Sequence, residues 1–278
     1  MDEINNTASG QTQSTPSAYV SSDTLTIRKE KILSLAKKSN LIVFVLLVLA
    51  LLLGVYLRSL PMMDHSAGIP TFSQFLFGFG SVYEGKPGLW DITTNTWTLG
   101  PDLDPWLFLR NAKTIVETCV LPERDMMRNV PLGFDNSIES KLLPYMIAWT
   151  YYMFQWLGIN SNVEFAGVVF PVVMFFFTII VFFLFVREAF IDTEKKEKTK
   201  ANAIAIIATF LMITIPVFIS RTIAGIPEKE SVAFLFLFLS LYLFLKAWRS
   251  KTLLAALFGL GAGIATGLMG LVWGGVLY

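Results

Sequence analysis

The stretch that decides the fold is residues 164–186, which read EFAGVVFPVVMFFFTIIVFFLFV. After Glu164 this stretch carries no charged side chain, and it is as long as the roughly 20 apolar residues that cross a bilayer. Further apolar runs of comparable length lie at 40–59, 202–219, 231–247 and 253–275. The sequence therefore predicts an all-α, polytopic membrane protein with five spans.

Composition supports this prediction and excludes several classes of protein. Of the 278 residues, 54% are hydrophobic and 15% are charged, whereas about a quarter of a soluble domain is charged. The net charge of +1 provides no basic field, so nucleic acid is not an expected partner. The single cysteine, Cys119, excludes an internal disulfide and a thiolate metal cluster, and His65 is the only histidine.

Charge distribution predicts the sides of the membrane. Residues 1–38 are polar and then basic, which is typical of a disordered cytoplasmic tail before the first span. The run at 142–158 is short and aromatic, so we expect an interfacial helix there rather than a span. The Lys-rich loop 187–201 then lies inside. Residues 60–163 form a large extracytoplasmic loop, and residues 220–230 form a small one.

Two acidic clusters fall in these outer regions. The first is DLDPWLFLR at 102–110, where Asp104 before Pro105 is typical of an N-cap and a helix over 105–118. The second is EKE at 228–230, at the start of a span, where acids offset the helix dipole. For each cluster alone, a structural role at the helix start is the favoured interpretation, and binding a ligand is the alternative.

The combination of the two clusters favours a binding role. Both lie on the predicted outer side, and both stand at the start of a helix. Carboxylate oxygens are hard ligands that suit Mg²⁺ or Mn²⁺ rather than zinc. Such an ion neutralises phosphate, so the pattern fits an enzyme that uses a phosphorylated lipid donor within the bilayer.

These residues resemble the catalytic subunit of oligosaccharyltransferase in its archaeal, single-subunit form. The segment 102–112, with LPERDMMR at 121–128, is similar to the family's first acidic motif and its downstream helix. The segment SRTIAG at 220–225, followed by an acid-x-acid triplet, resembles the second motif. The stretch LMGLVWGG at 268–275 resembles a tryptophan-glycine-glycine segment in a later span. The resemblance covers residues 100–278 and implies a lipid-donor glycosyltransferase fold with a large helical first extracytoplasmic loop.

The resemblance implies protein N-glycosylation: transfer of a glycan from a dolichyl phosphate-type donor to asparagine in Asn-x-Ser/Thr. Asp104 would bind the divalent cation, Mn²⁺ or Mg²⁺, and hold the acceptor amide, and Arg110 would assist in catalysis. Glu228 and Glu230 would complete the metal site, although the family usually has an aspartate in this triplet.

Further roles follow from the same resemblance. Lys229 and Arg221 would meet the donor phosphate, and Asp102 would be the secondary acid of the first motif. The implied partners are a dolichyl-linked oligosaccharide, an acceptor polypeptide and membrane lipid. The protein would reside in the cell membrane as a multi-pass protein, with a cytoplasmic N-terminus and extracytoplasmic acidic motifs.

Two other interpretations remain open at the level of sequence. Another lipid-donor glycosyltransferase, such as a protein mannosyltransferase, would share this pattern. A non-enzymatic transporter or channel subunit would place charges at mid-membrane, yet four of the predicted spans hold essentially no acid. The family also reads its acceptor with a C-terminal domain. We therefore expect this chain to be an N-terminal fragment whose C-terminal remainder is missing, and to be inactive alone.

Overall fold

The computed structural model describes residues 22–66, 68–78, 88–191 and 198–277. The chain divides into two units, residues 1–42 and residues 43–278, and the features below belong to the second unit unless stated. In the first unit, helix α1 (Ser22–Ser59) begins at Ser22, so the structure has helix at 22–38 where disorder was expected. Lys, Glu, Leu and Ala in this segment are strong helix formers, and the helix continues into the apolar run. Residues 1–21 lie outside the described residues.

Helices dominate the described residues, which confirms the predicted fold class. Four helical segments are long and apolar enough to cross a membrane: Asn40–Met62, formed by α1 with the 3₁₀ turn η1 (Leu60–Met62), and the helices α5 (Val163–Phe190), α8 (Lys229–Arg249) and α9 (Thr252–Val272). A fifth candidate consists of α6 (Lys198–Thr214) and α7 (Pro216–Thr222), which meet at a bend of 66°.

The bend corrects the expectation of one continuous span at 202–219. Pro216 has no backbone N–H and therefore cannot continue the hydrogen-bond ladder of α6. Ile215, the residue before it, has the extended backbone (φ −64°, ψ 120°) that a following proline favours. The segment that leads to the second acidic motif therefore runs in a different direction from α6.

The large loop between η1 and α5 contains three α-helices. Its helices are α2 (Phe72–Phe77), α3 (Leu103–Thr118) and α4 (Leu142–Trp156). Two antiparallel two-stranded sheets join them, one formed by β1 (Trp90–Asp91) and β2 (Thr96–Trp97), the other by β3 (Arg124–Asp125) and β4 (Phe134–Asp135), followed by the short turn η3 (Asn136–Ile138). At 15 residues, α4 is shorter than a membrane span, and its position at a membrane interface stays a prediction.

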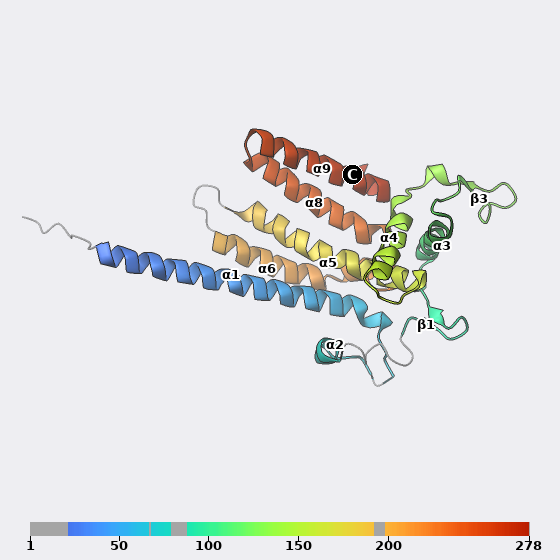
Figure 1. Cartoon of the computed structure of the whole chain (residues 1–278), viewed down its shortest axis with the longest axis horizontal. Helices are drawn as coiled ribbons and strands as arrows, with labels where there is room; N and C mark the ends of the chain where they lie inside the picture. The colour runs from blue at the N-terminus through green and yellow to red at the C-terminus, as the bar shows by residue number, and fades with distance from the viewer. Residues whose placement is uncertain (1–21, 67, 79–87, 192–197, 278) are drawn as a thin grey trace, which may run out of the picture. The chain divides into compact units, whose positions relative to one another are not determined.

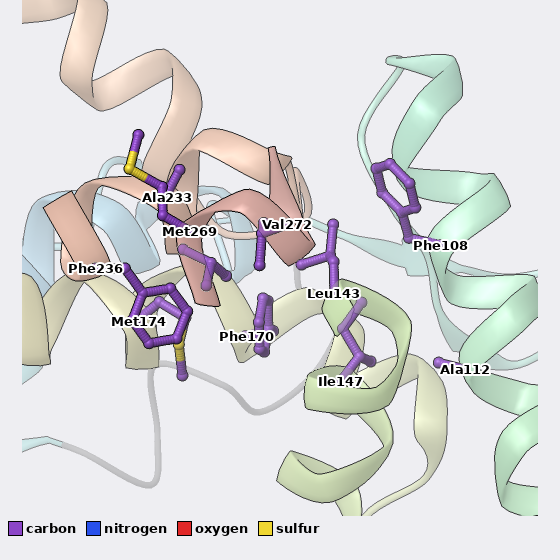
Figure 2. Close-up of a cluster of buried hydrophobic side chains, with 11 residues drawn as sticks. Phe108, Ala112, Leu143, Ile147, Phe170, Met174, Ala233, Phe236, Met269 and Val272 are labelled. Carbon is purple, nitrogen blue, oxygen red and sulfur yellow. The ribbon is translucent and has the colours of Figure 1, made fainter. Parts of the chain in front are cut away.

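Helix α5 is the central element of the second unit. It contacts both α6 and α8, between which it lies in Figure 1, and α8 packs along α9. Buried side chains from five helices form one cluster, which includes Phe108, Ala112, Leu143, Ile147, Phe170, Met174, Ala233, Phe236, Met269 and Val272 (Figure 2). Because α3 and α8 share this apolar cluster, the starts of these two helices, where the acidic motifs lie, are held in fixed relative positions.

Candidate functional site

The first acidic motif begins helix α3 two residues earlier than the sequence predicted. Asp102, not Asp104, is the N-cap, and its side chain accepts a hydrogen bond from the Leu103 backbone N–H at 2.9 Å. Pro105 is tolerated in the first turn because the N–H groups there have no partner within the helix. Asp104 therefore has no capping role, and its side chain is exposed beside the helix start.

The second motif follows α7 and leads into α8. Arg221 lies in the last turn of α7, and Glu228 is at the N-cap position of α8 but makes no side-chain cap. Ser231 closes this turn instead, donating its hydroxyl to the Glu228 carbonyl at 2.6 Å. The Glu228 carboxylate is thus free of capping, and its side chain is only 7% exposed.

Two glycines join the two motifs. The Gly100 backbone N–H donates to the Gly225 carbonyl at 2.9 Å, and the Gly225 N–H donates to the Val168 carbonyl of α5. Gly225 has a φ of +84°, and a Cβ there would lie 2.6 Å from the Leu89 side chain. A side chain at this position would be strained and would clash, so glycine is required for this approach of the two loops.

Arg221 lies between the acids of the two motifs. Its Nη1 is 3.6 Å from a Glu228 carboxylate oxygen and 3.9 Å from one of Asp102. The pKa of the Glu228 carboxyl is raised from 4.5 to about 7, chiefly because burial disfavours its charged form. The negative charges of Glu230, Asp102 and Asp104 act in the same direction. The structure therefore gathers excess negative charge at the place where the two motifs meet.

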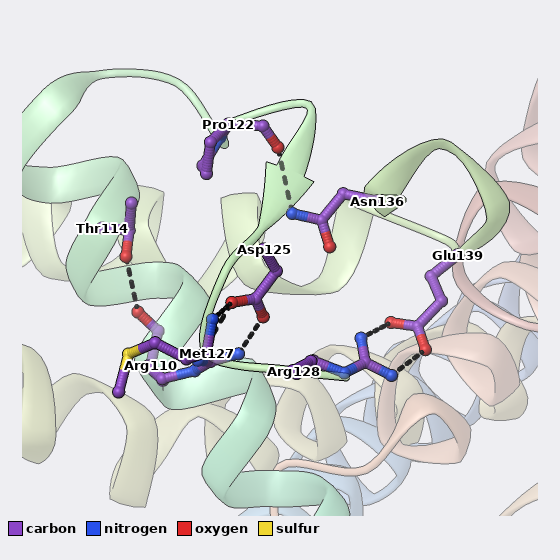
Figure 3. Close-up of polar contacts among 8 residues, drawn as sticks. All are labelled: Arg110, Thr114, Pro122, Asp125, Met127, Arg128, Asn136 and Glu139. Carbon is purple, nitrogen blue, oxygen red and sulfur yellow. Dashed lines mark hydrogen bonds and ion pairs between the residues drawn. The ribbon is translucent and has the colours of Figure 1, made fainter. Parts of the chain in front are cut away.

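Lys229 and Arg110, both predicted to act on the substrate, have partners within the protein. The Lys229 ammonium lies over the Phe108 ring of α3, 5.4 Å from its centroid. The Arg110 guanidinium forms a two-point ion pair with Asp125 of β3, which belongs to the segment 121–128 downstream of the first acids (Figure 3). Arg110 therefore fastens the β3–β4 hairpin to α3 rather than pairing with the acids at 102–104 or 228–230.

A second ion pair secures the same hairpin. Arg128 donates to both carboxylate oxygens of Glu139, at 2.9 and 3.0 Å (Figure 3). Its guanidinium also lies 3.8 Å from the centroid of the Phe134 ring. This hydrogen bonding lowers the pKa of Glu139 and raises that of Arg128. The charge of Asp104 also raises the pKa of Arg128, so the hairpin brings a cation into electrostatic range of the first motif.

Arg58, the residue that follows the charge-free run 41–57, packs against the segment that leads to the second motif. Its side chain is fully buried, with its guanidinium 3.8 Å from the centroid of the Phe175 ring. It donates to the Ile213 carbonyl at 2.5 Å and to the Thr222 hydroxyl at 3.2 Å, across the bend between α6 and α7. The sequence contained a sign of this role. A charged side chain at the end of an apolar run costs free energy in a membrane unless it has a polar or charged partner.

The carboxylates of the two motifs suit a hard divalent cation, but the described residues do not form a metal site. Within the described ranges, no three His, Cys, Asp or Glu side chains are grouped so that they could hold an ion. Burial is the main cause of the raised pKa of Glu228, and the negative charges of Glu230, Asp102 and Asp104 add to it although Arg221 lies beside the carboxylate. A cation would offset these charges, so the chemistry of the residues fits one.

The fold and the site together define a multi-pass membrane protein with acidic side chains gathered where its large loop meets the bent helix pair α6–α7. Residues 91–278 match the family described as oligosaccharyl transferase STT3, N-terminal. The chain belongs to this family, which confirms the resemblance of its motifs. No match was found among curated proteins.

Solved structures share the fold. The Archaeoglobus fulgidus oligosaccharyltransferase in complex with Zn and sulfate has a TM-score of 0.61 and 22% identity, over 83% of this chain and 25% of that chain. AglB from the same organism, in complex with an inhibitory peptide and a dolichol-phosphate, has a TM-score of 0.59, 23% identity and coverages of 84% and 24%. This chain therefore spans about a quarter of the length of these structures.

Proposed function

We propose that this chain is the N-terminal membrane part of an oligosaccharyltransferase. The intact enzyme would move a glycan from a dolichyl phosphate-type donor to asparagine in Asn-x-Ser/Thr. Membership of the STT3 family supports this assignment. So do similar solved structures, one of which is in complex with an inhibitory peptide and a dolichol-phosphate and another of which is tethered to an acceptor peptide with an NVT sequon.

One observation supports the proposal most directly: the two acidic motifs meet. They are 126 positions apart when counted from Asp102 to Glu228, yet Arg221 lies within 4 Å of both carboxylates. The Gly100–Gly225 hydrogen bond fixes this arrangement in the backbone. A transporter or channel subunit would have no need to bring acids from the starts of two helices beside one arginine.

The side chains at the junction, where the two acidic motifs meet, can take different roles in glycosyl transfer. Asp104, exposed and not engaged in capping, would hold the acceptor amide and orient its nitrogen toward the sugar. Arg221 would bind the donor phosphate, because a guanidinium offers paired donors that match phosphate oxygens. Lys229 would have to leave the Phe108 ring to contribute a second cation.

The same residues would hold a divalent cation. Asp104, Glu228 and Glu230 are the proposed ligands, and Mn²⁺ or Mg²⁺ is the proposed ion, although the similar structure named above contains Zn. When bound, the ion would stabilise negative charge on the leaving phosphate. Arg110 would act at a distance, by holding the β3–β4 hairpin beside the junction.

The proposed reaction takes place at the outer surface of the cell membrane. The N-terminus would be cytoplasmic, because basic residues are concentrated before the first apolar run and in the loop 187–201. The loop 60–163 and the segment 220–230 would then face outward, where acceptor polypeptides emerge. The donor would reach the junction from the bilayer, with its phosphate at the level of the helix ends.

Replacing Asp104 by alanine in the intact protein tests the proposal. We expect glycopeptide formation from lipid-linked oligosaccharide and a sequon peptide to fall by roughly 100-fold or more, because a group that acts on the reacting atoms is lost. Glu117→Ala, an exposed acid at the other end of α3, is the matched control and should retain activity. Undiminished product from Asp104→Ala would overturn the assignment.

A further inference from the structure

A second feature on the loop side of the molecule is a pocket away from the acids. It has a volume of about 450 Å³, within the size range of small-molecule sites. The β1–β2 hairpin forms one side, and the turn between α4 and α5, at residues 159–162, forms the other. The hairpin ends at Trp97, and the chain then runs directly to Gly100 and the first acidic motif.

Three aromatic rings, packed edge to face or tilted against one another, form part of the pocket wall. Trp90 and Trp97 are directly opposed across the hairpin, with ring centroids 5.7 Å apart and planes at 82°. Trp97 also contacts Phe165 of α5, with centroids 5.4 Å apart. Such rings offer apolar faces with little loss of conformational freedom when a ligand binds.

The remaining wall is rich in neutral polar groups. Asn162 is engaged, because its Nδ2 donates to the Thr96 hydroxyl at 2.6 Å and its Oδ1 accepts from the Phe165 backbone N–H. Asn95 and Asn160 also line the pocket, and neither amide makes a hydrogen bond to any described residue. Each of these amides offers two donors and one acceptor to a ligand.

The residues that line the pocket favour one class of ligand. None of the lining residues is Asp, Glu, Lys or Arg, so the pocket does not suit a phosphate or a carboxylate. A neighbouring cavity of about 470 Å³, lined by Val55, Met62 and Val172 among others, is almost entirely apolar and suits hydrocarbon. The mixed pocket instead matches a neutral pyranose, which has apolar C–H faces and a rim of hydroxyl groups.

We propose that this pocket binds a pyranose unit of the lipid-linked glycan, beyond the sugar that is transferred from the phosphate. The inference rests on the proposed function, since that function supplies a glycan near the first motif. The aromatic rings pack against the apolar face of the sugar, and the amides of Asn95 and Asn160 hydrogen-bond its hydroxyl groups. The pocket thereby orients the glycan and adds to donor affinity.

Two substitutions test the pocket without removing its structural contacts. Asn95 has a φ of +51°, so Asn95→Gly removes the amide without backbone strain, and Asn160→Ala removes the other amide. The matched control is Asn129→Gly, an exposed asparagine with a φ of +53° in the β3–β4 loop. In the intact protein, we expect the double variant to raise KM for the full-length glycan donor about tenfold at unchanged kcat.

A donor that carries a single sugar separates glycan recognition from other effects. Its KM should be the same in the double variant and the wild type, because no sugar reaches the pocket. An equal rise in KM for long and short donors, or no rise for either, would overturn the inference. A change confined to inhibition by the glycopeptide product would also overturn it, because the pocket would then bind the product rather than the donor.

Direct binding distinguishes failure of this inference from failure of the proposed function. The probe is the soluble oligosaccharide released from the donor lipid, observed by saturation-transfer NMR on the Asp104→Ala protein. We expect contacts that the double variant loses and that Asn129→Gly retains. This measurement needs no turnover, so absence of binding counts against the pocket even where the transfer reaction itself is established.

Discussion

Asp102 and Glu228 occupy the same position in two helices, the N-cap, but use it differently. The short side chain of Asp102 caps α3 and is 46% exposed. The longer side chain of Glu228 makes no cap and is 7% exposed, and its pKa is raised to about 7. Glutamate is not among the preferred N-cap residues. An exposed acid that accepts a hydrogen bond at a helix start stabilises the helix. An acid at the same position that is buried and makes no cap is a candidate for binding or catalysis.

The largest expected effect comes from removing the charge of Glu228. A folded-state pKa of about 7, against an ordinary 4.5, means that the folded protein binds this proton more tightly than the unfolded chain. The resulting stabilisation is complete below about pH 4.5 and is lost as pH rises through 7, up to about 3 kcal/mol for this shift. Glu228→Gln should therefore raise the melting temperature at pH 8 and change it little at pH 5.

Thermal unfolding of the detergent-solubilised protein, with a chelator present to exclude metal binding, measures this difference. Glu117→Gln serves as the control, because its exposed carboxylate should give the same melting temperature as the wild type at both values of pH. Equal effects of Glu228→Gln at pH 5 and pH 8 would show that Glu228 titrates normally. The contrast with Asp102 would then disappear.

An intermediate effect is expected from separating the two motifs at their glycine junction. Gly225→Ala places a Cβ at a φ of +84° and against Leu89, which should cost about 2 kcal/mol of stability and displace the second motif. Glycopeptide formation should fall together with the melting temperature. Gly259→Ala in α9, where a Cβ would meet nothing within 4 Å, should change neither property. Wild-type activity in Gly225→Ala would show that the close approach is dispensable.

The smallest effect is expected at the exposed cap. Asp102→Ala removes the hydrogen bond to the Leu103 N–H and should destabilise α3 by about 1 kcal/mol. Asp102→Asn keeps a capping oxygen and should restore the melting temperature. If Asp102→Asn is as unstable as Asp102→Ala, then the charge of Asp102 beside Arg221, rather than its capping bond, stabilises the wild-type protein.

The sequence by itself determined the features that depend on local composition. Apolar runs located the helices that can cross a membrane, and acids before apolar segments located the starts of α3 and α8. The break at Pro216 was not predicted: a continuous span was expected there, although proline cannot continue the hydrogen-bond ladder of a helix. These features follow from neighbours along the chain, whose effects hydropathy and backbone sterics describe directly.

Only the tertiary structure decided which of these features meet. The contact of Gly100 with Gly225, the position of Arg58 across the helix bend, and the pairing of Arg110 with Asp125 all depend on segments brought together by packing. The pocket between the β1–β2 hairpin and the α4–α5 turn arises in the same way. The physical reason is that burial, charge proximity and a shifted pKa are properties of three-dimensional neighbours, which a linear pattern does not specify.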